Sequence, residues 1–133
     1  MGTLIDSSVL IAAQRGQIDL DRLRDENDDE MVAMAAISAS ELLHGVHRLA
    51  NLVARLRAER FVERILGSLP IVAFDLDVAR VHARIDAELS ARGTRVGDAD
   101  LMIAATAVWL DYRIATRDVR SFPKITGLDV VRW

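Results

Sequence analysis

Acidic residues at five positions carry the chemistry that this sequence offers: Asp6, Glu41, Asp98, Asp100 and Asp118. Carboxylates that gather in one place repel one another unless a positive charge neutralises them. The hard cations Mg²⁺ and Mn²⁺ prefer oxygen ligands and suit such a cluster. In phosphodiester hydrolysis, a bound cation activates water and stabilises the charge that develops on the phosphate. If these acids meet in space, they predict a metal-dependent site for phosphodiester hydrolysis.

The number of ions stays open at this point. Mg²⁺ keeps several waters and binds only one or two carboxylates directly, so this set of acids fits either two metal positions or one metal with outer acids. Asp98 and Asp100 lie about 200° apart around a regular helix and cannot both point at one ion from inside it. We expect Asp100 to be a direct ligand, and Asp98 to be either the N-cap of that helix or an outer acid.

Alternating strands and helices must position these acids. Five short apolar runs predict strands at Thr3–Ile5, Val32–Ile37, Ile71–Phe74, Arg113–Thr116 and Asp129–Arg132. Helical periodicity predicts helices over Ser7–Arg15, over Ser38–Gly45, and over segments near residues 49–69, 78–89 and 98–110. The acidic stretch Asp25–Glu30 is expected to be a loop between a short helix and the second strand.

This alternation predicts an α/β fold, in which a parallel sheet is covered by helices on both faces. Ligands of such sheets bind beyond the carboxyl ends of the strands. Asp6, Glu41 and Asp118 each follow a predicted strand. Asp100 begins a helix that leads into the fourth strand, so that helix starts at the same edge. The acids are therefore expected to share one edge of the sheet.

Each acid also has a purely structural interpretation. Ser38 and Glu41 have the spacing of a capping box. Asp6, Asp98 and Asp118 stand where N-caps are expected. Asp75 also follows a strand, and we interpret it as an N-cap at the far edge of the sheet. The metal-site hypothesis depends on the acids acting together.

Four segments of the sequence resemble the PIN-domain family and, within it, the VapC toxins of VapBC modules. They are Leu4–Ile11, Ile37–Leu42, Gly97–Ala107 and Ile114–Phe122, which occur in the family's order and extend over nearly the whole chain. The resemblance implies a single PIN domain over residues 1–133. It also implies a three-layer α/β/α fold with a five-stranded parallel sheet in the order 3-2-1-4-5.

The same resemblance implies Mg²⁺- or Mn²⁺-dependent cleavage of single-stranded RNA by a homodimeric toxin that a VapB-type antitoxin inhibits. The family's site residues correspond to Asp6, Glu41, Asp100 and Asp118, with Asp98 an additional acid seen in some relatives. Relatives often have asparagine in place of Asp118. Ser8 and Thr116 match small hydroxyl residues that hydrogen-bond the ligands. Asp6 and Asp100 would hold the metal, and Glu41 and Asp118 would complete its shell or accept a proton from water.

Composition sets outer limits on the class of protein. A chain of 133 residues that is 51% hydrophobic fits one domain, and it contains no cysteine and no apolar run of membrane-spanning length. These features predict a cytoplasmic protein with no membrane segment. The net charge of -3 is unusual for a nucleic-acid-binding protein, although nearly all the basic residues are arginines, whose planar group matches phosphate.

Basic side chains near the acids are candidates for RNA contacts. Arg117 and Arg120 flank Asp118 and would contact RNA phosphates or pair with neighbouring acids. A second basic face follows the Glu41 helix, and we interpret it as a solvated surface with Glu59 and Glu63 as partners. It contains Arg48, Arg55, Arg57, Arg60 and Arg64. The apolar side of the same segment is a candidate groove for an antitoxin helix. For His44 and His47 we expect surface or structural roles.

Three alternatives to a toxin remain. The first is another nuclease of the same fold that acts on DNA or processes RNA. The second is a receiver-like signalling domain, which needs an aspartate after the third strand and a lysine after the fifth; Asp75 has the right place, but Lys124 precedes the fifth strand. The third is a catalytically silent PIN domain, against which the intact acids argue.

Overall fold

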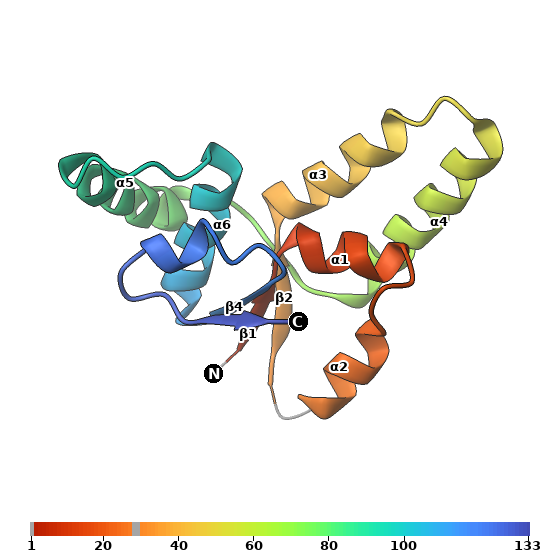
Figure 1. Ribbon diagram of the computed structural model, residues 1–133, viewed down its shortest axis with the longest axis horizontal. Helices are drawn as coiled ribbons and strands as arrows, with labels where there is room; N and C mark the ends of the chain where they lie inside the picture. Colours follow the sequence, from red (N-terminus) through yellow and green to blue (C-terminus); the bar gives the residue numbers. More distant parts are fainter. Residues whose placement is uncertain (1, 28–29) are drawn as a thin grey trace.

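A computed structural model describes residues 2–27 and 30–133 of the chain (Figure 1). The strands are β1 (Thr3–Ile5), β2 (Val32–Ala35), β3 (Ile71–Val72), β4 (Arg113–Thr116) and β5 (Val130–Arg132). The helices are α1 (Ser7–Gln14), α2 (Leu20–Glu26), α3 (Ala36–His47), α4 (Leu52–Ser68), α5 (Leu76–Ala91) and α6 (Asp98–Leu110). A short 3₁₀ helix, η1, covers Phe122–Lys124. Each predicted strand is present, with ends shifted by up to two residues.

The strands form one five-stranded sheet in the order β3-β2-β1-β4-β5. Each neighbouring pair runs parallel. The predicted order 3-2-1-4-5 is therefore confirmed. Strand order reverses between β1 and β4, the point at which open parallel sheets bind ligands. Asp6 follows β1 and Asp118 follows β4, so the topology brings both acids to this point.

Alternation along the central strands produces the two outer layers. Leu4 and Ile114 point into a core formed with α5, α6 and η1, whereas the next residues, Ile5 and Ala115, point into a core formed with α1 to α4. Figure 1 shows α5 and α6 on one side of the sheet and α1, α3 and α4 on the other. The three-layer α/β/α architecture is thus confirmed, and the central strands are apolar because both their faces are covered.

The second strand ends earlier than predicted. β2 stops at Ala35 and α3 begins at Ala36, so the predicted strand end at Ile37 and the helix start at Ser38 are wrong. Ala35 is the N-cap and makes no side-chain cap bond. The prediction failed because Ser38 is a preferred capping residue, whereas this turn uses a small apolar residue. Glu41 consequently lies in the second turn of α3.

The acidic stretch is helical at its start. Asp19 accepts a hydrogen bond from the backbone N–H of Arg22 and caps α2, which then continues to Glu26. The predicted loop at Asp25–Glu30 is therefore wrong at Asp25 and Glu26, and its residues 28 and 29 lie outside the described part of the chain. Within residues 2–27 and 30–133, no helix is both long and apolar enough to cross a membrane.

Candidate metal-dependent nuclease site

Asp6 lies at the centre of the candidate site. Its backbone occupies the N-cap position of α1, but its carboxylate makes no cap bond. Instead, Oδ2 accepts hydrogen bonds from the hydroxyls of Ser8 (2.6 Å) and Thr116 (2.9 Å), and the residue is 4% exposed. The backbone N–H of Arg117 donates to Ser8 Oγ (3.0 Å), which joins this network to the end of β4. The capping interpretation of Asp6 is therefore wrong, and two hydroxyls fix the orientation of its carboxylate.

Glu41 approaches Asp6 from α3. The hydroxyl of Ser7 donates a hydrogen bond to Glu41 Oε1 (3.2 Å), which ties the glutamate to the first residue of α1. Desolvation raises the pKa of Glu41, the Ser7 hydrogen bond partly offsets it, and the charges of Asp6 and Asp100 raise it further. The capping-box interpretation fails here too, because the helix begins upstream of Ser38.

Asp100 completes the acidic group from the first turn of α6. Burial of its carboxylate raises its pKa most, and repulsion by Asp6 and Asp118 adds to the shift. The side chain of Ser121 opposes the shift through a hydrogen bond. Carboxylates from four separate segments therefore lie close enough to sense each other's charge.

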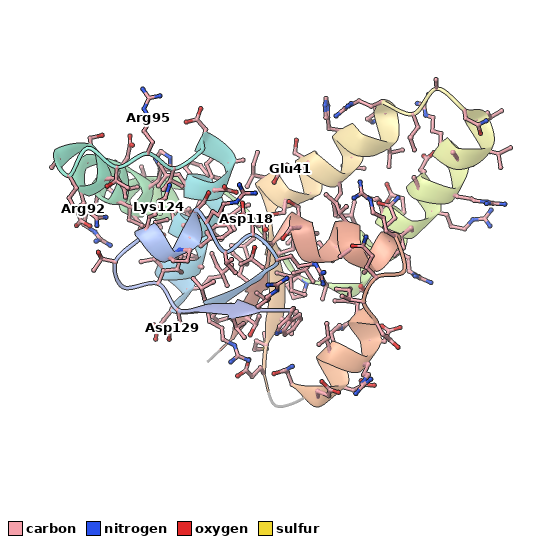
Figure 2. The ribbon with its side chains drawn as sticks, in the orientation of Figure 1. Glu41, Arg92, Arg95, Asp118, Lys124 and Asp129 are labelled. Atoms are coloured by element: carbon pink, nitrogen blue, oxygen red, sulfur yellow. The ribbon has the colours of Figure 1, made fainter. Side chains whose placement is uncertain are left out.

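Asp118 follows β4 at the same edge. Its backbone N–H donates to Thr116 Oγ1 (2.9 Å), and its Oδ1 accepts the backbone N–H of Arg120 (3.0 Å). Figure 2 shows Glu41 toward the sheet end of α3 and Asp118 in the segment after β4, both near the middle of the view between the two groups of helices. Thr116 thus contacts both the Asp6 carboxylate and the Asp118 backbone, and it couples the ends of β1 and β4.

Asp98 stands apart from this group. It is the exposed first residue of α6, and Gly97 rather than Asp98 is the N-cap. The predicted N-cap role is therefore wrong, because the helix starts one residue earlier than the capping rule placed it. Asp98 is also not among the charges that shift the pKa of Glu41 or Asp100. The structure thus places Asp100 among the other acids and Asp98 outside them, in line with the expectation that Asp100 is the one at the site. The role of Asp100 as a metal ligand stays a prediction.

The control residue Asp75 behaves as predicted. Its Oδ1 accepts the backbone N–H of Val78 (3.0 Å) and caps α5, beyond the edge strand β3. Asp75 and Asp6 occupy the same sequence context after a strand, yet the Asp75 carboxylate accepts a backbone N–H of its own helix, whereas the Asp6 carboxylate accepts the side-chain hydroxyls of Ser8 in α1 and Thr116 in β4. The partner of the carboxylate, rather than its position, distinguishes a cap from a site residue.

The acids fit a hard divalent cation in donor type and in charge. All four carry carboxylate oxygens. Burial raises the pKa values of Glu41 and Asp100, and repulsion between the carboxylates, which a cation would lessen, adds to both shifts. In the described residues, no three histidine, cysteine, aspartate or glutamate side chains converge closely enough to form a ready metal cage. An ion that takes one or two carboxylates directly and water for the rest of its shell, as Mg²⁺ does, would not require such a cage.

Two hydroxyls at the site escaped the sequence analysis. Ser7 bonds to Glu41, and Ser121 interacts with Asp100. Ser7 is adjacent to Asp6, so proximity to a predicted ligand was an available signal. Ser121 lies in the loop after β4, and only the folded structure shows which acid it reaches. Both contacts favour the ionised form of the acid that they touch.

The two arginines beside Asp118 differ in what they contact. Arg117 donates to the backbone carbonyl of Trp133 (3.4 Å), so its side chain is held at the end of the chain. The Arg120 side chain is 93% exposed and lies 4.0 Å from Asp118 Oδ1, the pairing with a neighbouring acid that the sequence left open. On α4, no ion pair links Arg55, Arg57, Arg60 or Arg64 to an acid within the described residues. The predicted pairing of that face with Glu59 and Glu63 is therefore wrong.

Comparison with known proteins assigns the chain to a family. Residues 3–128 match the model of the PIN domain. The chain belongs to the PIN-domain family. It is 31% identical over 131 residues to ribonuclease VapC1 of Rickettsia felis, covering 98% of this chain and 96% of that protein. It is also 26% identical over 130 residues to the tRNA(fMet)-specific endonuclease VapC of Salmonella typhimurium, covering 98% and 96%.

Solved structures of PIN-domain proteins show the same fold. A DNA-bound VapBC complex from Salmonella typhimurium contains a chain that superposes with a TM-score of 0.90 and 25% identity, covering 100% of this chain and 98% of that one. The acids described above therefore occupy the carboxyl edge of a PIN-domain sheet. The receiver-like alternative is set aside by this membership, and also by Asp75, which is a helix cap.

Proposed function

We propose that this PIN-domain protein is a Mg²⁺- or Mn²⁺-dependent endoribonuclease that hydrolyses RNA phosphodiesters. The observation that carries the proposal is the meeting of four carboxylates, from four segments of the chain, at the point where strand order reverses. The Asp6 carboxylate bonds to two hydroxyls rather than capping its helix. Burial raises the pKa values of Glu41 and Asp100, and repulsion by neighbouring carboxylates raises them further. The relatives named as ribonucleases support the same activity.

Each acid has a distinct proposed task. Asp6 and Asp100 would hold the cation, since both are partly or fully withdrawn from solvent and Asp6 is fixed by Ser8 and Thr116. When bound, the cation would activate water and stabilise negative charge on the phosphate. Glu41, whose raised pKa favours proton uptake, would accept a proton from the attacking water at a carboxylate oxygen. Asp118 would complete the outer shell.

We further propose that the protein is the toxin of a type II toxin–antitoxin module and that it acts in the cytoplasm, where its RNA substrate would be. The VapBC complexes among its structural relatives support a VapB-type antitoxin as partner. The first half of α4 offers a surface for it, because Leu52 is 67% exposed, Val53 60% and Leu56 53%. Apolar side chains at this spacing suit a groove for an amphipathic helix.

A homodimer stays a prediction from the family resemblance. Exposed apolar side chains at the β3 edge, Ile71, Phe74 and Leu76, provide one surface through which two copies could pack. Measuring the mass in solution by light scattering, for the wild type and for Leu76→Ser, tests both the dimer and this surface. A wild-type monomer at micromolar concentration would contradict the dimer.

The decisive experiment measures cleavage of single-stranded RNA by purified protein. Wild-type protein is expected to cut RNA with Mg²⁺ or Mn²⁺ and to stop on chelation, and Asp6→Asn or Asp100→Asn is expected to abolish cutting. Asp75→Asn is the matched control, because it replaces an aspartate in the same sequence context that caps a helix instead. Cleavage that persists in Asp6→Asn would show a different site or a contaminating nuclease. Preferential cutting of DNA would favour the alternative nuclease.

A further inference from the structure

A groove leads away from Glu41 between α1 and α3, which pack side by side (Figure 1). Its volume is about 790 Å³, and Glu41 is one of its lining residues. The α3 wall continues through His44 to Arg48, and the α1 wall contains Gln14 and Arg15. The groove therefore opens directly on the acidic site rather than forming a separate hollow.

Helical spacing explains why these side chains share the groove. Glu41, His44 and Arg48 are three and four residues apart, so they lie along one face of α3. The distance along the helix axis from the first to the last is about 10 Å at 1.5 Å per residue. Ile11, Gln14 and Arg15 follow the same rule on α1. Two helices thus present matching faces to the same space.

The charge of the groove is opposite to that of the site. Its ionisable lining consists of Arg15, Arg48 and His44 beyond the single acid Glu41. Arg15 and Arg48 are exposed, and neither forms an ion pair with an acid in the described part of the chain. The lining also includes Ile11, Leu42 and Val46, and Leu42 and Val46 are buried, so the exposed guanidinium groups are more accessible to a ligand than these apolar side chains. An extended anion can enter the acidic site only together with a cation. In the groove, the same anion would meet the positive charges of Arg15 and Arg48.

We propose that the α1–α3 groove holds the RNA backbone on one side of the scissile phosphate, and that Arg15 and Arg48 bind its phosphates. This inference rests on the proposed ribonuclease activity, since it is Glu41 that connects the groove to the reacting phosphate. Arginine suits this task because its planar donors match phosphate oxygens. An RNA chain is favoured over an acidic peptide because an endonuclease substrate must continue past the cut, and the groove begins at the cut.

Both arginines also have a structural explanation that the test must separate. Arg15 and Arg48 are the C-caps of α1 and α3, where positive charge interacts favourably with the helix dipole. A dipole role predicts a lower melting temperature when they are replaced, and no effect on RNA. A phosphate role predicts weaker RNA binding and a smaller dependence on salt.

The experiment measures binding of a fluorescent single-stranded RNA to the full chain carrying Asp6→Asn, so that the probe stays intact. Adding Arg15→Gln and Arg48→Gln is expected to weaken binding about tenfold. The slope of log affinity against log salt should fall by about 1.4, or about 0.7 per phosphate contact on a single strand. The matched control, Arg80→Gln with Arg84→Gln, removes the same charge from α5 on the other side of the sheet and should leave both quantities unchanged.

Three outcomes would overturn the proposal. The first is unchanged RNA affinity and salt slope in the Arg15→Gln, Arg48→Gln variant. The second is an equal loss in the α5 control, which would show only nonspecific charge attraction. The third is unchanged RNA binding together with weaker binding of a polyglutamate peptide, which would make the groove a peptide site. Lysine at both positions should preserve most of the salt slope because the charge remains.

Failure of the inference is distinguishable from failure of the proposed function. If protein with Asp6 in place cleaves RNA but the Arg15→Gln, Arg48→Gln variant binds RNA with unchanged affinity, the ribonuclease proposal is supported and the groove proposal is contradicted. If the wild type neither binds nor cleaves RNA, the proposed function is contradicted, and so is the groove proposal that rests on it.

Discussion

Carboxylates at the two edges of the sheet have opposite kinds of partner. At the amino edge, Glu30 Oε2 accepts hydrogen bonds from Arg113 Nη2 (2.9 Å) and from Thr3 Oγ1 (2.7 Å), and Arg113 also donates to Thr3 and Asn27. Its charge is matched by a cation within the protein. At the carboxyl edge, the Asp6 carboxylate accepts hydrogen bonds from the hydroxyls of Ser8 and Thr116 and is repelled by the nearby carboxylates of Glu41 and Asp100.

This contrast separates carboxylates that stabilise the fold from carboxylates that serve chemistry. A paired carboxylate lowers the free energy of the folded state, so its removal should weaken the fold. A group of carboxylates that repel one another raises that free energy, and such strain is typical of functional sites. Replacing one charged residue at each edge should therefore have opposite consequences for stability and activity.

The largest expected effect follows Glu41→Gln at the carboxyl edge. Catalytic efficiency on RNA should fall by about 10²–10⁴-fold, the usual contribution of a general base. The free energy of unfolding at neutral pH should not fall. A raised carboxyl pKa means that ionising Glu41 costs folding free energy above its ordinary pKa, and glutamine removes that cost. Cleavage kinetics and urea unfolding measure the two quantities.

Either of two results would break the comparison at this edge. Full activity in Glu41→Gln would remove the glutamate from the chemistry. A large loss of stability would show that Glu41 is held as a structural acid through Ser7.

The next effect is the loss of stability in Arg113→Ala. The Arg113 and Glu30 side chains are 25% and 27% exposed, so their pairing is only partly screened by water. Removing the arginine takes one hydrogen-bond partner from each of Glu30, Thr3 and Asn27, leaves the Glu30 charge unpaired, and should cost about 2 kcal/mol of unfolding free energy. Urea unfolding measures this cost. The cleavage rate per folded molecule should stay at the wild-type value.

A matched control is the exposed pair of Arg84 and Glu88 on α5, whose side chains are 57% and 52% exposed. Arg84→Ala should cost at most about 0.5 kcal/mol, as is usual for a surface pair in a helix. Equal losses in the two variants would show that the amino-edge network is no stronger than a surface ion pair.

A smaller effect is the stabilisation of the protein by divalent cations. Mg²⁺ or Mn²⁺ at roughly ten times its dissociation constant should add about 1.4 kcal/mol of stability, because the ion binds the folded chain alone. Thermal melts with and without the ion measure this shift. Asp6→Asn with Asp100→Asn should abolish it, while Arg113→Ala should keep it. A shift that survives the double replacement would place the ion elsewhere.

The fold was predictable because its signals are repeated along the chain. Each central strand is a short apolar run, and each run alternates with a helical pattern, so the parallel sheet and its layers followed from periodicity and topology alone. The strand order needed the family resemblance. Errors occurred at boundaries, such as Ala35 and Ser38, where a strand passes into a helix through small residues that carry no capping signal.

The gathering of the acids at one edge was predictable, but their contacts were not. Asp6, Glu41 and Asp118 were selected by their positions after strands, and Asp100 by its position at the start of the helix that leads into the fourth strand. These sequence signals could not show that Ser7 and Ser121 touch two of these acids, because such contacts join elements far apart in sequence. They favoured Asp100 over Asp98 as the direct ligand, but through a capping rule that placed the N-cap one residue too late. The ranking of the two acids depends on the depth at which each lies in the first turn of α6.

The smallest effect, and the sharpest test of this ranking, compares Asp98→Asn with Asp100→Asn. The two changes remove the same charge from the same helical turn, so general electrostatic effects on RNA binding should be similar. Asp100 senses the charges of Asp6 and Asp118, whereas Asp98 is exposed and does not act on either shifted acid. Asp98→Asn should therefore change catalytic efficiency by less than about twofold, the scale of an exposed surface charge. Parallel single-turnover cleavage assays give both values, and a loss in Asp98→Asn as large as that in Asp100→Asn would return Asp98 to the metal site.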